Sequence, residues 1–157
     1  MNELDEDTLD LLNALDEQGA EYMLVGAHAL AAHGVVRATS DVDILVRASQ
    51  LNAQRVFDAL VAFGAPVTAH GLDAAYFSRE GRVYQIGLPP RRIDLLSSIS
   101  GVEASEAFST AEERIIGGSK RRILSAQMML KNKRATGRIK DLADVERLER
   151  QLSKTQK

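Results

Sequence analysis

Cysteine is absent from the 157-residue chain, which excludes disulfide bonds, zinc sites built on thiolates and a cysteine nucleophile. Aromatic residues make up only 4% of the sequence, so few side chains could stack on nucleic-acid bases. No apolar run approaches the roughly 20 residues of a membrane-spanning helix, so we expect no membrane partner. The acidic N-terminal segment lacks the basic and apolar regions of a signal peptide. These absences favour a cytoplasmic protein.

The charges are nearly balanced, with a net charge of −2, so the molecule as a whole is not a polyelectrolyte binder. Their distribution is uneven, because the ionisable side chains of 1–19 are all acidic and those of 119–140 are all basic. A basic segment opposite an acidic site would suit a substrate that carries phosphates, but two solvated helix faces explain the pattern equally well. The length fits a single domain over 1–157.

Hydrophobic periodicity predicts strands in the first two thirds of the chain and helices in the last third. Strands are expected at 21–26, 41–46 and 91–96, with a hairpin formed by 75–78 and 82–86. Helices are expected at 7–18, 27–33, 49–63, 102–108, 122–133 and 138–152. The predicted class is α+β: a mixed β-sheet core over about 1–100 with helices packed on it, then a helical lobe over about 101–152.

Two aspartates, Asp41 and Asp43, stand at the start of an apolar strand. Because side chains alternate along a strand, both carboxylates project from one face, roughly 7 Å apart. They repel each other unless a cation lies between them, and Mg²⁺ prefers hard oxygen ligands of this kind. The pair therefore indicates a metal site.

A third acid, Asp94, lies inside the apolar strand at 91–96, where an unpaired charge is costly. If this strand neighbours the strand of Asp41 and Asp43, the three carboxylates converge. They could then hold two Mg²⁺ ions about 3.5–4 Å apart, with Mn²⁺ as a substitute. Asp94 is also the candidate base for a hydroxyl proton. We predict that all three acids are metal ligands and catalytic residues.

Residues upstream of the acids offer contacts for phosphate groups. Gly26 and Ala27 follow a strand and open a helix, where backbone amides favour phosphate and glycine allows close approach. Arg37 can pair with phosphate, and Thr39 can hold the turn that aims Asp41. We predict that Gly26, Ala27, Arg37 and Thr39 bind the nucleotide.

The run from Gly26 to Asp43, G-A-x-A-x-x-x-H-G-x-x-R-x-T-x-D-x-D, resembles the signature of the polymerase-β-like nucleotidyltransferase superfamily. It is most similar to the branch of small bacterial proteins related to AbiEii-type toxins. That superfamily opens its site with Gly-Ser or Gly-Gly, follows with a D-x-D pair and places a third acid on a later strand. The serine position is Ala27 here, which has no hydroxyl for a phosphate, so an impaired or altered enzyme is an open alternative.

The toxin-like branch also carries a lysine in a C-terminal helix and a later Lys/Arg-Asp-Leu-x-Asp run. Here these look like Lys131 and the run K-D-L-A-D at 140–144. The resemblance implies that Lys131 binds the triphosphate. Without the resemblance, Asp141 and Asp144 are better explained as caps or as partners of arginines on the helix.

The leading hypothesis is a metal-dependent nucleotidyltransferase. It would move a nucleoside monophosphate from a nucleoside triphosphate to a hydroxyl of a tRNA, a protein or a small molecule, releasing pyrophosphate. The resemblance also implies a toxin of a toxin–antitoxin pair, with an antitoxin protein as partner. The alternative is a non-catalytic module that keeps the fold to bind nucleotide or a partner. A third hypothesis is an RNA-binding accessory protein that uses the basic segment, with an affinity that falls steeply with salt.

Overall fold

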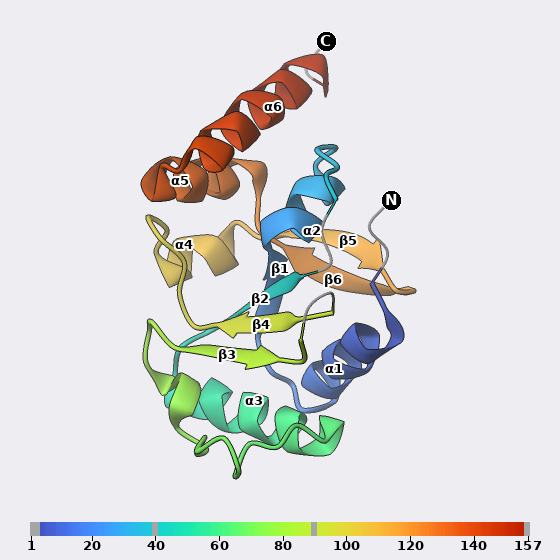
Figure 1. The fold of residues 1–157 in the computed structure, drawn as a ribbon, viewed down its shortest axis with the longest axis vertical. Helices are drawn as coiled ribbons and strands as arrows, with labels where there is room; N and C mark the ends of the chain where they lie inside the picture. Colours follow the sequence, from blue (N-terminus) through green and yellow to red (C-terminus); the bar gives the residue numbers. More distant parts are fainter. Residues whose placement is uncertain (1–3, 39–40, 89–90, 156–157) are drawn as a thin grey trace.

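The computed structural model describes residues 4–38, 41–88 and 91–155, and in them one six-stranded mixed sheet carries helices (Figure 1). The predicted α+β class is confirmed. The strands lie in the order β3-β4-β2-β1-β6-β5. They span Tyr22–Val25 (β1), Val42–Val46 (β2), Val83–Ile86 (β3), Ile93–Leu96 (β4), Glu112–Ile116 (β5) and Ser119–Ile123 (β6). The helices span Glu6–Glu17 (α1), Gly26–Ala32 (α2), Gln50–Phe63 (α3), Ala104–Ser109 (α4), Ala126–Thr136 (α5) and Ile139–Thr155 (α6).

Strands β1, β2 and β4 form the centre of the sheet because nearly all of their side chains are apolar and buried. β1 and β2 are antiparallel, with Val25 opposite Asp43. β2 and β4 are parallel, with Asp43 beside Asp94. The sheet register therefore decides which acids meet.

The helices have recognisable start and stop signals. Side-chain oxygens of Asp5, Ser49 and Ser125 accept hydrogen bonds from first-turn amides of α1, α3 and α5. Gly64 and Gly137 end α3 and α5 in the left-handed conformation, which suits glycine. α1 and α3 contact each other, and α5 and α6 lie at the opposite end of the molecule (Figure 1). Across the described ranges, no helix has the length and hydropathy that crossing a membrane requires.

Residues 112–123 show that the prediction of helix everywhere beyond residue 97 is wrong. They form the antiparallel hairpin β5–β6, and β6 joins the sheet by pairing parallel with β1. The helix predicted over 122–133 begins only at Ala126. Strand-forming residues on both sides of Gly117-Gly118 are a hairpin signal that the helical prediction overlooked. The C-terminal third therefore contributes two strands as well as helices.

The predicted hairpin of 75–78 and 82–86 is wrong in its first strand. Residues Tyr76–Ser78 form a 3₁₀ helix, η1, and β3 pairs antiparallel with β4 instead. η1 contacts α3, and the side chain of Phe77 is buried. A compact turn allows this burial of a large aromatic side chain, which outweighs the strand propensity of the segment.

Arg121 of β6 ties the hairpin to α1. Its side chain is only 1% exposed. It donates to Asn13 Oδ1 at 2.7 Å, to Asp16 Oδ2 at 3.3 Å, to the Tyr22 hydroxyl at 3.3 Å and to the Ile116 carbonyl at 2.5 Å. A buried guanidinium needs this degree of pairing because an unpaired charge in the interior is costly. Arg121 is therefore a structural residue rather than a solvated member of the basic segment.

Arg121→Met should lower the free energy of unfolding by about 2–4 kcal/mol, because methionine fills the space but removes four hydrogen bonds, one of them to the hydroxyl of the buried Tyr22. The matched control is Arg114→Met on β5, whose side chain is 38% exposed and pairs with Glu112; it should cost less than about 1 kcal/mol. Urea denaturation followed by circular dichroism measures both. Equal losses would contradict a structural role for Arg121.

Candidate functional site

The three predicted acids meet at one end of the sheet. Asp43 of β2 lies beside Asp94 of β4 in the parallel register, and Asp41 comes one residue before β2. Asp43 also lies opposite Val25, where β1 passes into α2. Residues paired across strands share a face, and so do alternate residues of one strand. The structure thus brings Asp41, Asp43 and Asp94 together, as their spacing predicts, while their catalytic and metal-binding roles stay predictions.

Two of the three acids, Asp43 and Asp94, have raised pKa values. Burial raises the pKa of Asp43 to about 6; the charges of Asp94 and Asp41 add to the rise, and those of Lys133 and Arg92 oppose it. Burial also raises the pKa of Asp94 from its ordinary value, against the charge and hydrogen bond of Arg92. Ionised carboxylates in such a place are favoured only if positive charge is supplied.

Arg92 is the cation that the structure places among the acids. Its Nη2 donates to Asp41 Oδ2 at 3.1 Å and to Asp94 Oδ2 at 3.4 Å, and its Nε lies 3.1 Å from Asp94 Oδ1. Within the described ranges, neither Arg92 Nε nor Asp94 Oδ1 has a hydrogen-bond partner, although both atoms are buried. Sequence analysis missed Arg92, yet its position two residues before Asp94 puts it on the same strand face.

The donor set fits a divalent cation by its chemistry but is not assembled around one. Asp41, Asp43 and Asp94 offer the hard oxygen ligands that Mg²⁺ prefers. The raised pKa of Asp43 shows that the site lacks the positive charge that would keep this carboxylate ionised at its ordinary pKa. In the part of the chain that the structure describes, no three His, Asp or Glu side chains are arranged to hold one ion. Arg92, bonded to two of the acids, would have to move for an ion to reach all three.

Gly26 gives the Asp43 carboxylate its space. Gly26 opens α2 with a φ of +66°, in the left-handed region that favours glycine. A Cβ at this position would overlap Oδ2 of Asp43. The close approach predicted for a phosphate is therefore made here by a carboxylate of the protein. Ala27 is buried beside it, and the predicted contacts of both residues with nucleotide stay predictions.

Lys133 of α5 supplies a second positive charge near the acids. Its side chain is 9% exposed, and its Nζ lies 3.4 Å from Asp141 Oδ1 and 3.2 Å from Asp144 Oδ2. Its charge is also felt by Asp43, whose pKa it lowers. The two α6 acids thus hold a buried lysine whose charge acts on Asp43.

Arginines complete the pairing of the two α6 acids. Arg37 Nη1 donates to Asp144 Oδ2 at 2.7 Å, and Arg138 Nε donates to Asp141 Oδ2 at 2.7 Å. Burial alone would raise the pKa of Asp141, but hydrogen bonds from Arg138 and Thr136 outweigh burial and hold it well below its usual range. The interpretation that these acids pair with arginines is confirmed, but the arginines are not on the helix: Arg138 comes directly before α6, and Arg37 comes from the segment after α2. Arg37, predicted to bind phosphate, is thus held at Asp144.

The structure does not bring Lys131 to the acids. Its Nζ pairs with Glu106 Oε1 at 2.6 Å, and its side chain is 49% exposed. Residues two positions apart on an α-helix point about 200° apart, so Lys131 and Lys133 lie on opposite sides of α5. Lys133 is the α5 lysine whose charge acts on Asp43, and the contact of Lys131 with the triphosphate stays a prediction. Thr39, predicted to bind nucleotide, lies outside the described residues.

Gly26→Ala should lower the free energy of unfolding by about 1–3 kcal/mol more than Gly19→Ala, because only at Gly26 does the methyl group meet the Asp43 carboxylate. Gly19 is a close control, with a φ of +69° and open space around it. Urea denaturation measures both variants. Combining Gly26→Ala with Asp43→Ala should remove most of the excess loss, because only the Cβ of residue 43, 3.2 Å from the added methyl group, remains. An undiminished excess would contradict the steric explanation.

Asp43→Asn should make the protein more stable at pH 7.5 in EDTA, by about 1–3 kcal/mol. Between about pH 4 and 6, folded wild type keeps a proton on Asp43 that the unfolded chain has lost. Its stability therefore falls as pH rises through this window, and asparagine has no proton to lose. The gain should shrink toward pH 4, as measured by urea denaturation across pH. The exposed Asp10→Asn is the control, and an Asp43→Asn variant less stable than wild type at pH 7.5 would refute this prediction.

Comparisons with known proteins identify the fold. Neither a protein-family model nor a curated protein sequence matches the chain. Among solved structures, the lincomycin-bound lincosamide antibiotic adenylyltransferase LnuA is 13% identical with a TM-score of 0.54, covering 94% of this chain and 98% of that one. The antibiotic-resistance factor ANT(2'')-Ia is 19% identical with a TM-score of 0.52, covering 90% and 80%. An antigenic nucleotidyltransferase-like protein from Paracoccidioides brasiliensis is 17% identical with a TM-score of 0.50, covering 94% and 78%. This chain has the nucleotidyltransferase fold.

Proposed function

We propose that the chain is a metal-dependent nucleotidyltransferase that transfers a nucleoside monophosphate from a nucleoside triphosphate to a hydroxyl acceptor. The observation that carries the proposal is the meeting of Asp41, Asp43 and Asp94 at one end of the sheet, with more negative charge than Arg92 alone balances. The shared fold supports the same activity, because similar structures include an adenylyltransferase. That enzyme acts on a lincosamide antibiotic, which adds weight to a small-molecule acceptor beside tRNA or a protein.

In the proposed reaction, the acceptor oxygen bonds to the α-phosphorus while the bond from that phosphorus to the pyrophosphate oxygen breaks. The hydroxyl proton passes to Asp94, whose raised pKa makes it a better proton acceptor near neutral pH than an ordinary aspartate. Arg92, once it leaves the carboxylates, can pair with phosphate oxygens through its planar fork. Backbone amides at Gly26 and Ala27 and the guanidinium of Arg37 are further candidates for the triphosphate.

Asp41, Asp43 and Asp94 would hold the divalent ions, two Mg²⁺ as expected for three converging carboxylates, with Mn²⁺ as a substitute. Such ions, when bound, neutralise the triphosphate and lower the pKa of the attacking hydroxyl. The protein contributes a partly buried set of oxygen donors, in which the pairing of β2 with β4 fixes Asp43 beside Asp94. Lys133 adds a positive charge from α5 that Asp141 and Asp144 hold in place.

A non-catalytic module that binds nucleotide or a protein partner is the second candidate. Arg92 favours it, because a cation within the chain already pairs with Asp41 and Asp94. Ala27, which lacks a hydroxyl, favours it too. The finer proposal of a cytoplasmic toxin with an antitoxin partner rests on the sequence resemblance alone.

Wild-type protein with Mg²⁺, nucleoside triphosphates labelled at the α-phosphate and pools of tRNA, cellular protein or lincomycin should transfer label to one pool. Asp94→Asn should slow this transfer by about 10²–10⁴-fold because the proton acceptor is lost. Asp43→Asn should also lose Mg²⁺-dependent nucleotide binding, measured by calorimetry. Asp10→Asn, on the exposed side of α1, should behave as wild type. Binding of nucleotide without transfer to any pool would favour the non-catalytic module.

A further inference from the structure

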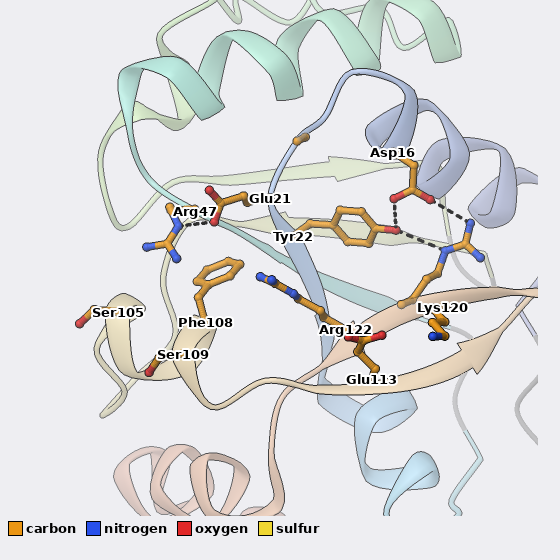
Figure 2. Close-up of a pocket in the computed structure, with 12 residues that line it drawn as sticks. Asp16, Glu21, Tyr22, Arg47, Ser105, Phe108, Ser109, Glu113, Lys120 and Arg122 are labelled. Carbon is orange, nitrogen blue, oxygen red and sulfur yellow. Dashed lines mark hydrogen bonds and ion pairs between the residues drawn. The ribbon is translucent and has the colours of Figure 1, made fainter.

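A cavity of about 730 Å³ lies at the opposite end of the sheet from the acids, between α4, the end of β2 and the β5–β6 hairpin (Figure 2). Its walls carry Arg47, Lys120 and Arg122, together with Phe108 and Ser105 of α4. We call the space between these five residues the basic hollow. Its volume is in the range of small-molecule binding sites.

The basic hollow opens on the same sheet face as the acids but is separate from them. Asp43 and Arg47 are four residues apart on one extended segment, so they share a face and lie roughly 13 Å apart. Leu45 lies between them and is buried. Among the described residues that line the hollow, none belongs to the acid cluster.

Two of the cations in the basic hollow are available to a ligand. Lys120 and Arg122 alternate with the buried Arg121 on β6 and are exposed. In the part of the chain that the structure describes, their side chains have no hydrogen bond or ion pair with the protein. Three acids line the cavity, and two of them already have partners, Asp16 with Arg121 and Glu21 with Arg47. The third, Glu113, lies opposite Arg122 on β5 and is the acid that opposes the two cations. In Figure 2, Arg122 extends from β6 toward Phe108. Two free cations beside one acid favour an anionic ligand.

Arg47 provides a fixed flat surface in the same space. Its guanidinium carbon lies 4.4 Å from the centroid of the Phe108 ring, and its Nε donates to Glu21 Oε2 at 2.6 Å. The side chain is still 34% exposed. Phe108 covers one face of the guanidinium and Glu21 holds its edge, so the other face can stack on a base.

We propose that the basic hollow binds a base-bearing phosphate, with the base on Arg47 and the phosphate on Lys120 and Arg122. Two sources share this chemistry: a free nucleoside phosphate and one nucleotide unit of an RNA strand. This site is distinct from the carboxylate cluster and needs no divalent ion. It gives the exposed side of β6 a function besides pairing in the sheet.

The test uses fluorescence anisotropy in EDTA, with fluorescent ATP and a labelled single-stranded RNA ten-mer as separate probes. Replacing both Lys120→Gln and Arg122→Gln should weaken binding roughly tenfold or more, because charge-assisted contacts to phosphate are lost. The control, Arg150→Gln with Lys154→Gln on α6, removes the same charge from another exposed surface and should change affinity less than about twofold. Glu113→Gln should tighten binding, because it removes the opposing charge.

The role of Arg47 has its own test. Arg47→Lys keeps the charge but loses the plane, so it should weaken ATP binding while competition by inorganic tripolyphosphate stays near wild type. Binding of ATP alone would identify a free nucleotide as the ligand, and binding of RNA alone would identify a strand. The proposal is overturned if neither probe binds in EDTA, or if both charge-removing double variants lose affinity equally. Because EDTA removes divalent ions, failure here is independent of failure at the carboxylate cluster.

Discussion

Repulsion among Asp41, Asp43 and Asp94 is the constraint to which the surrounding structure responds. The parallel pairing of β2 with β4 forces Asp43 beside Asp94, and burial with its neighbours' charges raises the pKa of Asp43 to about 6. The free-energy cost of this repulsion is offset by the burial of apolar residues in the same strands, such as Ile44 and Leu95, which are fully buried in the core. Strain of this kind at one end of a well-packed sheet is typical of a functional site.

The cations around the acids come from different parts of the fold. Arg92 comes from the segment that leads into β4 and contacts two of the acids directly. Lys133 comes from α5 and is fixed by Asp141 and Asp144 of α6. The C-terminal helices therefore do more than cover the sheet, because α6 holds the lysine whose charge acts on Asp43. A nucleotide with its metal ions would enter a site whose charges are already partly balanced from two directions.

Much of this arrangement could be predicted from the sequence, because it follows from short-range rules. Alternation along a strand places Asp41 and Asp43 on one face, and an acid inside an apolar run, Asp94, signals a buried partner or ion. Ser49 and Gly64 likewise mark the ends of α3. These features need only the local period of the chain and the cost of burying charge.

The remaining features depend on tertiary structure. Lys131 and Lys133 are both lysines of the same helix, and the sequence alone does not tell which of them is buried. The packing of α5 against α6 shows that Lys133 is buried and Lys131 is exposed. The charged segment 112–123 lacks the continuous apolar pattern of a buried strand, so its place at the edge of the sheet was missed. Alternation along the strand places Arg92, but not Arg91, on the face of Asp94, whereas its contact with Asp41 depends on the register of β4 with β2.

The most direct test of the central claim is a crystal structure of the protein grown with Mn²⁺ and a non-hydrolysable nucleoside triphosphate, with Mn²⁺ located by its anomalous signal. We predict an anomalous peak in contact with the Asp41 and Asp43 carboxylates, the triphosphate beside Gly26, and Arg92 turned away from Asp94. An Arg92 that keeps both of its carboxylate contacts, with neither Mn²⁺ nor triphosphate at the acids, would contradict the proposed function.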